Sequence, residues 1–203
     1  HQFGEVIERD RHDTVFGEVA VRGTAGRQTW VGGLAIERDA YTTRDVPRFD
    51  YTFTVPGAFA QYDVTASPHL SLSASARLDV HSEYGTFFSP RVSALARAGR
   101  WTSRLSVGTG FFGPTPITEE TEAAGLSRLE VRQPVEAERG LSASFDVSRT
   151  DGPLSYTATL FPSRINDPLH VERSPSYVLG TLPDPTTNVG LELLGTLRRE
   201  PFS

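Results

Sequence analysis

The segment between residues 111 and 139 carries the side chains whose chemistry is best suited to binding. It combines two adjacent aromatic rings, two acidic residues and three arginines: Phe111, Phe112, Glu119, Glu120, Arg128, Arg132 and Arg139. Arginine binds anionic groups through paired hydrogen bonds, and aromatic rings contact planar or cationic groups. A connection this long in a compact protein is usually functional or disordered. We therefore expect these residues to contact a ligand, and the alternative is a loop that only shields the structure beneath it.

Two other groups of residues suggest metal or catalytic chemistry. Glu119, Glu120 and Glu122 could hold a hard cation, but an acidic run in a long loop is more often a solvated surface. Asp79 and His81 lie two residues apart on one strand face, where they either begin a catalytic pair or line a polar interior. No nucleophile stands at a diagnostic spacing from them. The sequence therefore predicts no enzyme, no metal site and no cofactor.

The glycines of residues 108–113 spell GxGxxG, a pattern known from dinucleotide-binding sites. That pattern works where the glycines open a helix whose N-terminus holds a pyrophosphate. Here Pro114 and Pro116 follow at once, and the preceding strand is two-faced. We expect Gly108 and Gly110 to make room inside a curved sheet instead.

Composition excludes further classes of protein. The chain has no cysteine, so disulfides, thiolate metal sites and cysteine nucleophiles are all absent. Its net charge of -5 argues against a nucleic-acid partner, which requires a basic face. The first residue is His1 and no methionine is present, and we expect the chain to be a piece of a longer polypeptide.

The elements that must position these residues are β-strands. From Leu70 to His81, apolar side chains alternate with polar ones at all twelve positions, the period of a strand with one apolar and one wet face. Residues 101–111 repeat this pattern, with Trp101, Leu105, Val107 and Phe111 on the apolar face. No apolar run reaches the length of a membrane helix. We predict an all-β fold, an antiparallel meander of about nine long strands without a confident helix.

The connections between these strands alternate in length. Residues 23–27, 67–69, 98–100 and 150–152 form short turns, 39–56 and 111–136 form long connections, and 83–89 is intermediate. Strands of roughly 9 to 13 residues, joined by short turns at one end and by long loops at the other, are typical of outer-membrane barrels. We also expect aromatic girdles at both rims, from Trp30, Trp101, Tyr41, Tyr84, Phe87, Phe88, Phe111 and Phe112.

Several motifs resemble the barrel of TonB-dependent outer-membrane receptors, over nearly the whole chain. Residues 108–115 are similar to the family's G-x-G-F-R-A-P-T segment, although Phe112 and Gly113 replace the usual Arg and Ala, so the role of that Arg is not carried over. The remaining matches are Val135, Glu138 and Arg139, with Ala137 in place of a Pro; Phe161, Ile165 and Asp167; and Gly190 with Glu192.

The resemblance implies that residues 1–203 are part of a transmembrane barrel of about 22 strands, without the N-terminal plug domain and the terminal strands. It implies residence in the outer membrane of a Gram-negative-type bacterium, in contact with lipid. It also implies TonB-driven uptake, through the missing plug, of a scarce small-molecule ligand such as an iron–siderophore, cobalamin or another metal complex. The alternative is a soluble all-β binding or adhesion module.

Overall fold

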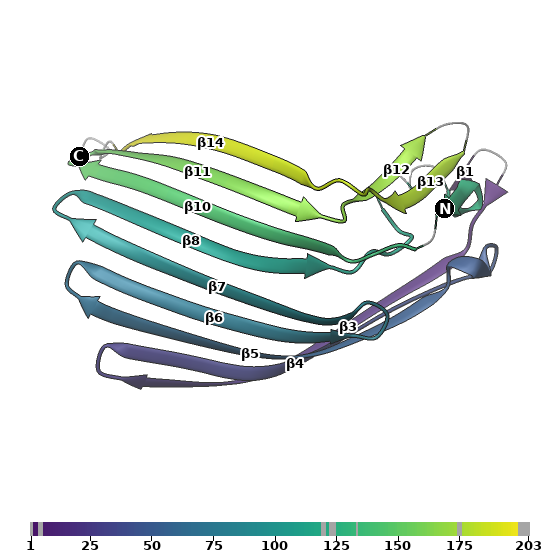
Figure 1. Cartoon of the computed structure of the whole chain (residues 1–203), viewed down its shortest axis with the longest axis horizontal. Coiled ribbons are helices and arrows are strands. Elements are labelled where there is room, and N and C mark those ends of the chain that lie inside the picture. The colour runs from purple at the N-terminus through teal and green to yellow at the C-terminus, as the bar shows by residue number, and fades with distance from the viewer. Residues whose placement is uncertain are drawn as a thin grey trace, which may run out of the picture.

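One large antiparallel sheet dominates the computed structural model, which describes residues 2–3, 6–118, 121, 125–132, 134–173 and 176–198. Nine strands lie side by side in the order β14-β11-β10-β8-β7-β6-β5-β4-β3, and Figure 1 shows them as one curved trough. Their bounds are β3 Asp10–Ala25, β4 Gln28–Thr43, β5 Tyr51–Ser67, β6 Leu70–His81, β7 Gly85–Ala98, β8 Trp101–Phe112, β10 Glu138–Asp151, β11 Leu154–Asn166 and β14 Thr186–Leu197. The predicted all-β meander of nine long strands is confirmed.

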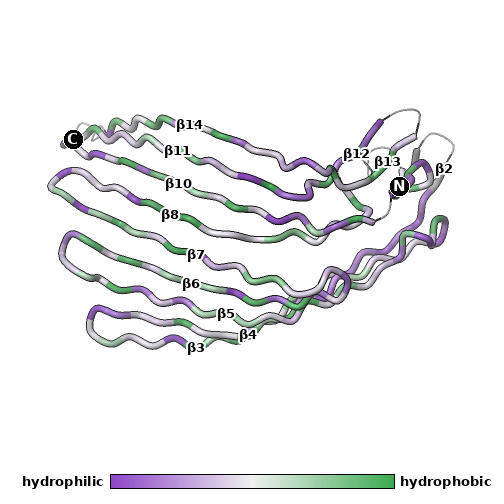
Figure 2. The backbone as a smooth tube through the Cα atoms, in the orientation of Figure 1, coloured by the Kyte–Doolittle hydropathy of each residue, from purple (hydrophilic) through white to green (hydrophobic). Residues whose placement is uncertain are grey.

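The alternation of side chains gives the sheet two unlike faces. Directly paired residues point to the same side, so the pairs Leu105–Ala94 and Leu105–Phe145 extend one apolar row over three strands. We call this side the outer face; its side chains are among the most exposed, with Val19 at 73% and Leu193 at 74%. Figure 2 shows the resulting alternation of hydropathy along the strands. The opposite side, the inner face, carries serines, arginines and carboxylates.

The two ends of the sheet also differ. At one end, two-residue turns at 26–27, 68–69, 99–100 and 152–153 join consecutive strands. Gly26 and Gly99 have positive φ angles of 58° and 59°, which glycine adopts at little cost. The other end, which we call the rim, carries the connections 44–50, 82–84, 113–137 and 167–185. The predicted asymmetry of short and long connections is therefore present.

Two predicted connections were too long. The connection expected at residues 39–56 is shorter, because β4 and β5 continue to pair up to Tyr41 opposite Tyr51. The connection expected at residues 83–89 is reduced to 82–84, because β7 begins at Gly85, opposite His81. The segment around Val171 does not join the large sheet but forms β12 (Leu169–Arg173) in a separate three-stranded sheet with β13 (Tyr177–Thr181) and β9 (Leu129–Val131). Short alternating segments do not reveal which sheet they join, because the period is the same in both.

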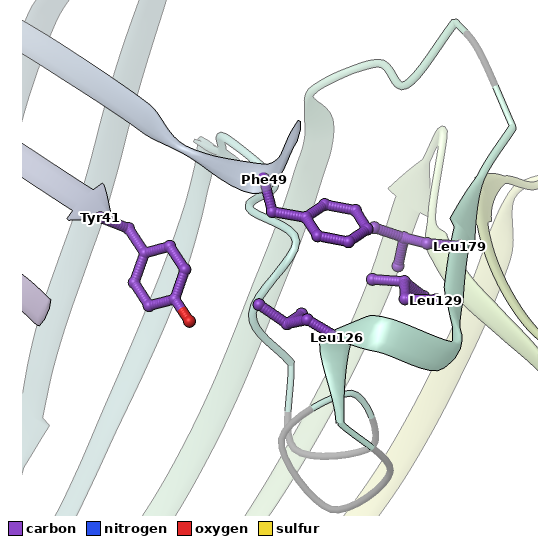
Figure 3. Packing of buried hydrophobic residues seen from close by; sticks show 5 residues of the cluster. All are labelled: Tyr41, Phe49, Leu126, Leu129 and Leu179. Atoms are coloured by element: carbon purple, nitrogen blue, oxygen red, sulfur yellow. The ribbon is translucent and has the colours of Figure 1, made fainter. Parts of the chain in front are cut away.

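The rim connections fold around a small core of their own. Tyr41, Phe49, Leu126, Leu129 and Leu179 form a buried cluster, and Figure 3 shows the last four pointing toward one another. Phe49 ends the 3-10 helix η1 (Pro47–Phe49) and Leu126 begins η2 (Leu126–Arg128). The remaining elements are β1 (Gln2–Phe3) and β2 (Val6–Ile7). None of the described helices is long and apolar enough to cross a membrane.

Candidate binding site at the rim

Three rim connections are held together by buried side chains and by hydrogen bonds. The carboxylate of Glu8 accepts hydrogen bonds from the backbone N–H groups of Leu126 and Ser127, at 3.0 and 2.8 Å. A guanidinium N–H of Arg48 donates to the carbonyl oxygen of Leu129 at 3.0 Å. Because Leu129 also packs against Leu179, the connections 44–50, 113–137 and 167–185 form one folded unit.

A cavity of about 770 Å³ lies between this unit and the inner face of the sheet. It is within the usual size range for small-molecule sites, roughly 300 to 1,000 Å³. Its walls combine aromatic and aliphatic surface with charges of both signs; the lining includes Arg48, Phe49, Asp50, Tyr51, Phe53, Glu83, Tyr84, Glu130 and Leu179. The cavity can therefore surround a ligand with both planar and charged groups.

An aromatic row lines the inner face beside this cavity. Tyr41 stacks with Tyr51 at 5.9 Å between ring centroids, and Tyr51 stacks with Phe53 at 4.6 Å. The row continues from Phe53 to His81 and from His81 to Tyr84, with 4.9 Å between ring centroids in each pair. The hydroxyl of Tyr84 donates to the carbonyl oxygen of Pro114 at 2.7 Å. Burial, and then the nearby Glu83 carboxylate, raise the pKa of Tyr84, which keeps this donor protonated.

A polar network lies next to the aromatic row, on three neighbouring strands. The Nε2 atom of His12 is 2.6 Å from Oδ1 of Asp39, and the hydroxyl of Thr14 donates to the same oxygen at 2.9 Å. The hydroxyl of Tyr51 donates to Oδ2 of Asp39 at 3.1 Å. The Asp39 carboxylate on β4 therefore has hydrogen-bond partners on both neighbouring strands, β3 and β5.

Phe111 does not lie on the apolar face that its position in the alternation predicts. Its ring stacks on Phe87 at 3.9 Å, and the guanidinium of Arg139 lies 5.5 Å from the Phe87 ring. Phe87 is directly opposite Asp79, so it belongs to the inner face. β7 pairs with β8 only from Trp101 to Gly108, whereas β8 pairs with β10 as far as Phe112, with Phe111 directly opposite Arg139. The structure therefore brings Phe111 and Arg139 together on Phe87.

The other predicted site residues are more dispersed. Phe112 is half exposed and lines a second inner cavity of about 480 Å³, together with Phe111. Arg128 ends η2 on the surface, and Arg132 lies 3.6 Å from the carboxylate of Glu172. Glu119, Glu120 and Glu122 lie outside the described residues.

Asp79 and His81 line the polar inner face, the second of the two alternatives that the sequence left open for them. The Asp79 carboxylate is paired with the guanidinium of Arg77 at 2.8 Å and is almost completely buried. Nδ1 of His81 accepts the backbone N–H of Glu83 at 3.1 Å. Both groups are thus occupied by structural contacts. Across the described part of the chain, no three His, Cys, Asp or Glu side chains gather as metal ligands.

Only some of the residues expected to form aromatic girdles lie on the outer face of the sheet. Trp30 and Trp101, near the short turns, are 46% and 45% exposed. At the rim, Phe88 lies opposite Leu78 on the outer face and is 64% exposed. The other expected members, Tyr41, Tyr84, Phe87, Phe111 and Phe112, instead line the inner side or the rim core. Aromatic residues at a strand end do not by themselves indicate which face they occupy.

Sequence reasoning missed the contribution of η1 and β5 to the larger cavity. Arg48, Phe49, Tyr51 and Phe53 all line the larger cavity, but none was among the predicted site residues. A signal was available, because residues 41–53 contain four aromatic side chains within a short polar stretch. Such aromatic enrichment is typical of binding surfaces.

Comparison with known proteins gives a family match and a structural match. The sequence model of the family described as "TonB dependent receptor-like, beta-barrel" matches residues 3–203. No curated protein matches the sequence. The siderophore receptor PirA from Pseudomonas aeruginosa is similar in structure, with a TM-score of 0.74 and 16% identity, over 92% of this chain and 37% of that one.

Two transporters show the same likeness. The FrpB iron transporter from Neisseria meningitidis has a TM-score of 0.74 and 14% identity, over 94% of this chain and 34% of its own. The copper transporter OprC has a TM-score of 0.77 and 14% identity, over 95% of this chain and 35% of its own. The chain thus spans about a third of the length of these proteins, and they share its fold.

Proposed function

Because the chain belongs to the TonB-dependent receptor-like β-barrel family, we propose that it forms part of the barrel of an outer-membrane receptor for TonB-driven uptake. The observation that carries this proposal is the contrast between the two faces of one long-stranded sheet. The outer face exposes large apolar side chains on strand after strand, whereas the inner face is polar. A soluble binding module would have to bury such an apolar face, whereas in a membrane barrel the lipid covers it.

The proposed ligand is a scarce metal complex, such as an iron–siderophore or cobalamin. The similar proteins named above include a siderophore receptor, an iron transporter and a copper transporter, which supports this class. The rim cavity supplies aromatic walls and both signs of charge. In this proposal the TonB complex acts through a plug domain, and the barrel segment contributes the wall and the outer loops.

Topology is the first testable consequence of this proposal. We expect the rim to face the outside of the cell and the short turns to face the periplasm. In the complete receptor, single cysteines at Ser127 and Asp184 should react with a membrane-impermeant maleimide on intact cells. Cysteines at Arg27 and His69, in exposed short turns, should react only after the outer membrane is opened. Labelling of His69→Cys but not Ser127→Cys on intact cells would reverse the proposed orientation.

The second prediction concerns Arg139, whose guanidinium lies over Phe87 at the edge of a rim cavity. A panel of ferric siderophores, cobalamin and copper complexes should contain a compound that the complete receptor imports only when the TonB complex is energised. For that compound, Arg139→Gln should weaken binding at least about tenfold, roughly 1.4 kcal/mol, because a charge-assisted contact is lost.

Arg100→Gln is the matched control, since it removes the same charge at the opposite end of the sheet, where Arg100 pairs with Asp151. Its affinity should equal that of the unmodified receptor. If the unmodified receptor, Arg139→Gln and Arg100→Gln bound the compound with equal affinity, Arg139 would not belong to the site. Import that is independent of TonB would refute the transport proposal.

A further inference from the structure

The polar network at the rim end of β3, β4 and β5 has the composition and spacing of a metal site. Four potential donor atoms face one another: Nε2 of His12, both carboxylate oxygens of Asp39 and the hydroxyl oxygen of Tyr51. Nε2 lies 2.6 Å from Oδ1, the Tyr51 oxygen lies 3.1 Å from Oδ2, and the Tyr51 oxygen lies 3.4 Å from Nε2. These contacts close a ring of imidazole, carboxylate and phenol.

The size of this ring matches what one ion requires. Two ligands at right angles, each about 2.0 to 2.2 Å from a metal, are separated by about 3 Å. The separations in the ring scatter around this value, so a single ion can reach all four atoms after small shifts. The described residues contain no cluster of three His, Cys, Asp or Glu side chains, and this group becomes a ligand set only because a phenol completes it.

The donor types select the kind of ion. Carboxylate and phenolate are hard anionic oxygens, which prefer hard, highly charged cations, and imidazole suits iron as well. We propose that His12, Asp39 and Tyr51 bind a hard trivalent cation, Fe³⁺ in particular, on the inner face of the sheet. On binding, the Tyr51 hydroxyl loses its proton to solvent and its oxygen becomes a ligand. Nε2 of His12 binds only as an unprotonated nitrogen, so the proton that it shares with Asp39 moves to Nδ1 or leaves to solvent.

The position of the site permits access from the lumen. The His12 side chain is 47% exposed, and Asp39 borders the inner cavity of about 480 Å³. Coordination positions not used by the protein are therefore open to water or to the oxygens of a chelator. This inference rests on the proposed function, because the bound cation would belong to the material that the receptor imports.

The local framework holds the ligands in place without the ion. His12 is paired directly with Tyr41, and Tyr41 with Tyr51, so the three rings occupy adjacent strands in fixed register. The Tyr41 hydroxyl is engaged elsewhere, donating to Oδ2 of Asp10 at 2.9 Å. Such preorganisation lowers the cost of binding.

The test is titration of the purified complete receptor in detergent with ferric nitrilotriacetate as the probe. Binding should produce the visible charge-transfer absorption of iron bound to tyrosinate, together with iron retained in equilibrium dialysis. Tyr51→Phe should abolish the absorption and lower the affinity at least about tenfold, roughly 1.4 kcal/mol, while the ring stacks with Tyr41 and Phe53 remain. Asp39→Asn should lower the affinity to a similar extent.

Tyr62→Phe is the matched control, because Tyr62 lies on the same strand but pairs with Trp30 and Ala74 on the outer face. It should retain both the absorption and the affinity. Absence of iron binding by the unmodified receptor, or an unchanged absorption in Tyr51→Phe, would leave the network as a set of hydrogen bonds that only joins strands. Since this assay requires neither TonB nor a membrane, its outcome is separate from that of the uptake and labelling experiments.

Discussion

Arginine in place of Leu105 is expected to destabilise the membrane-inserted protein by about 2 to 4 kcal/mol, the cost of a charged side chain near the bilayer midplane. Leu105 is 50% exposed on the outer face, opposite Ala94 and Phe145. It lies near the middle of β8 and has no polar neighbour directly across either strand. The free energy of unfolding of the complete receptor in lipid vesicles, measured by denaturant titration, gives the effect.

Ser144→Arg provides the comparison at nearly the same depth. Ser144 lies on the adjacent strand, opposite Ser106 on the inner face, where a wet lumen can solvate the new charge. This variant should unfold within about 0.5 kcal/mol of the unmodified receptor. Equal destabilisation by the two substitutions would show that the outer face does not contact lipid, and the soluble alternative would then be preferred.

The second large effect is expected at Leu129, the most deeply buried leucine of the rim core at 1% exposure. Leu129→Ala should cost about 2 to 5 kcal/mol, because it removes buried apolar contacts and leaves a cavity. The loss should be mainly local, since every buried member of the rim core except Tyr41 of β4 comes from the connections and not from the nine-stranded sheet. Amide hydrogen exchange should therefore accelerate in β9 and β13, whose parallel pairing includes Leu129 opposite Tyr177, while β6 stays protected.

Leu182→Ala serves as the control, because Leu182 belongs to the same connection as β13 but is 38% exposed. It should leave the exchange of β9 and β13 nearly unchanged. If Leu129→Ala also left them unchanged, the three connections would not form one folded unit. If it accelerated exchange throughout the large sheet, the rim core would be part of the barrel's own cooperative unfolding.

The two-faced sheet and its strands could be predicted because the relevant signal is local. In β6 every second side chain from Leu70 to Val80 is apolar, and a strand has only two faces on which to place them. The short turns carry their own signals, such as the glycines at 26 and 99, whose positive φ angles few other residues adopt. The nine strands and the alternation of short and long connections followed from these two signals.

The predicted binding residues show where local signals end. Arg139 was predicted to contact a ligand, and in the structure its guanidinium lies over Phe87, which is 24 residues before Phe111, the start of the predicted segment. No periodicity links Phe87 to Arg139. Phe111 follows the alternation of β8 in sequence, yet its ring stacks on Phe87 of the inner face, and no local pattern in the sequence indicates this.

The sequence by itself thus determined the strand faces, the order of the strands and the family of this protein, because each depends on residues near one another in the chain. Only the tertiary structure decided which distant residues share a site. Glu8 caps η2 from more than one hundred residues away, and His12, Asp39 and Tyr51 meet on three strands. Such contacts depend on strand register and on how long connections fold over the rim, and neither is encoded in a local pattern of hydropathy.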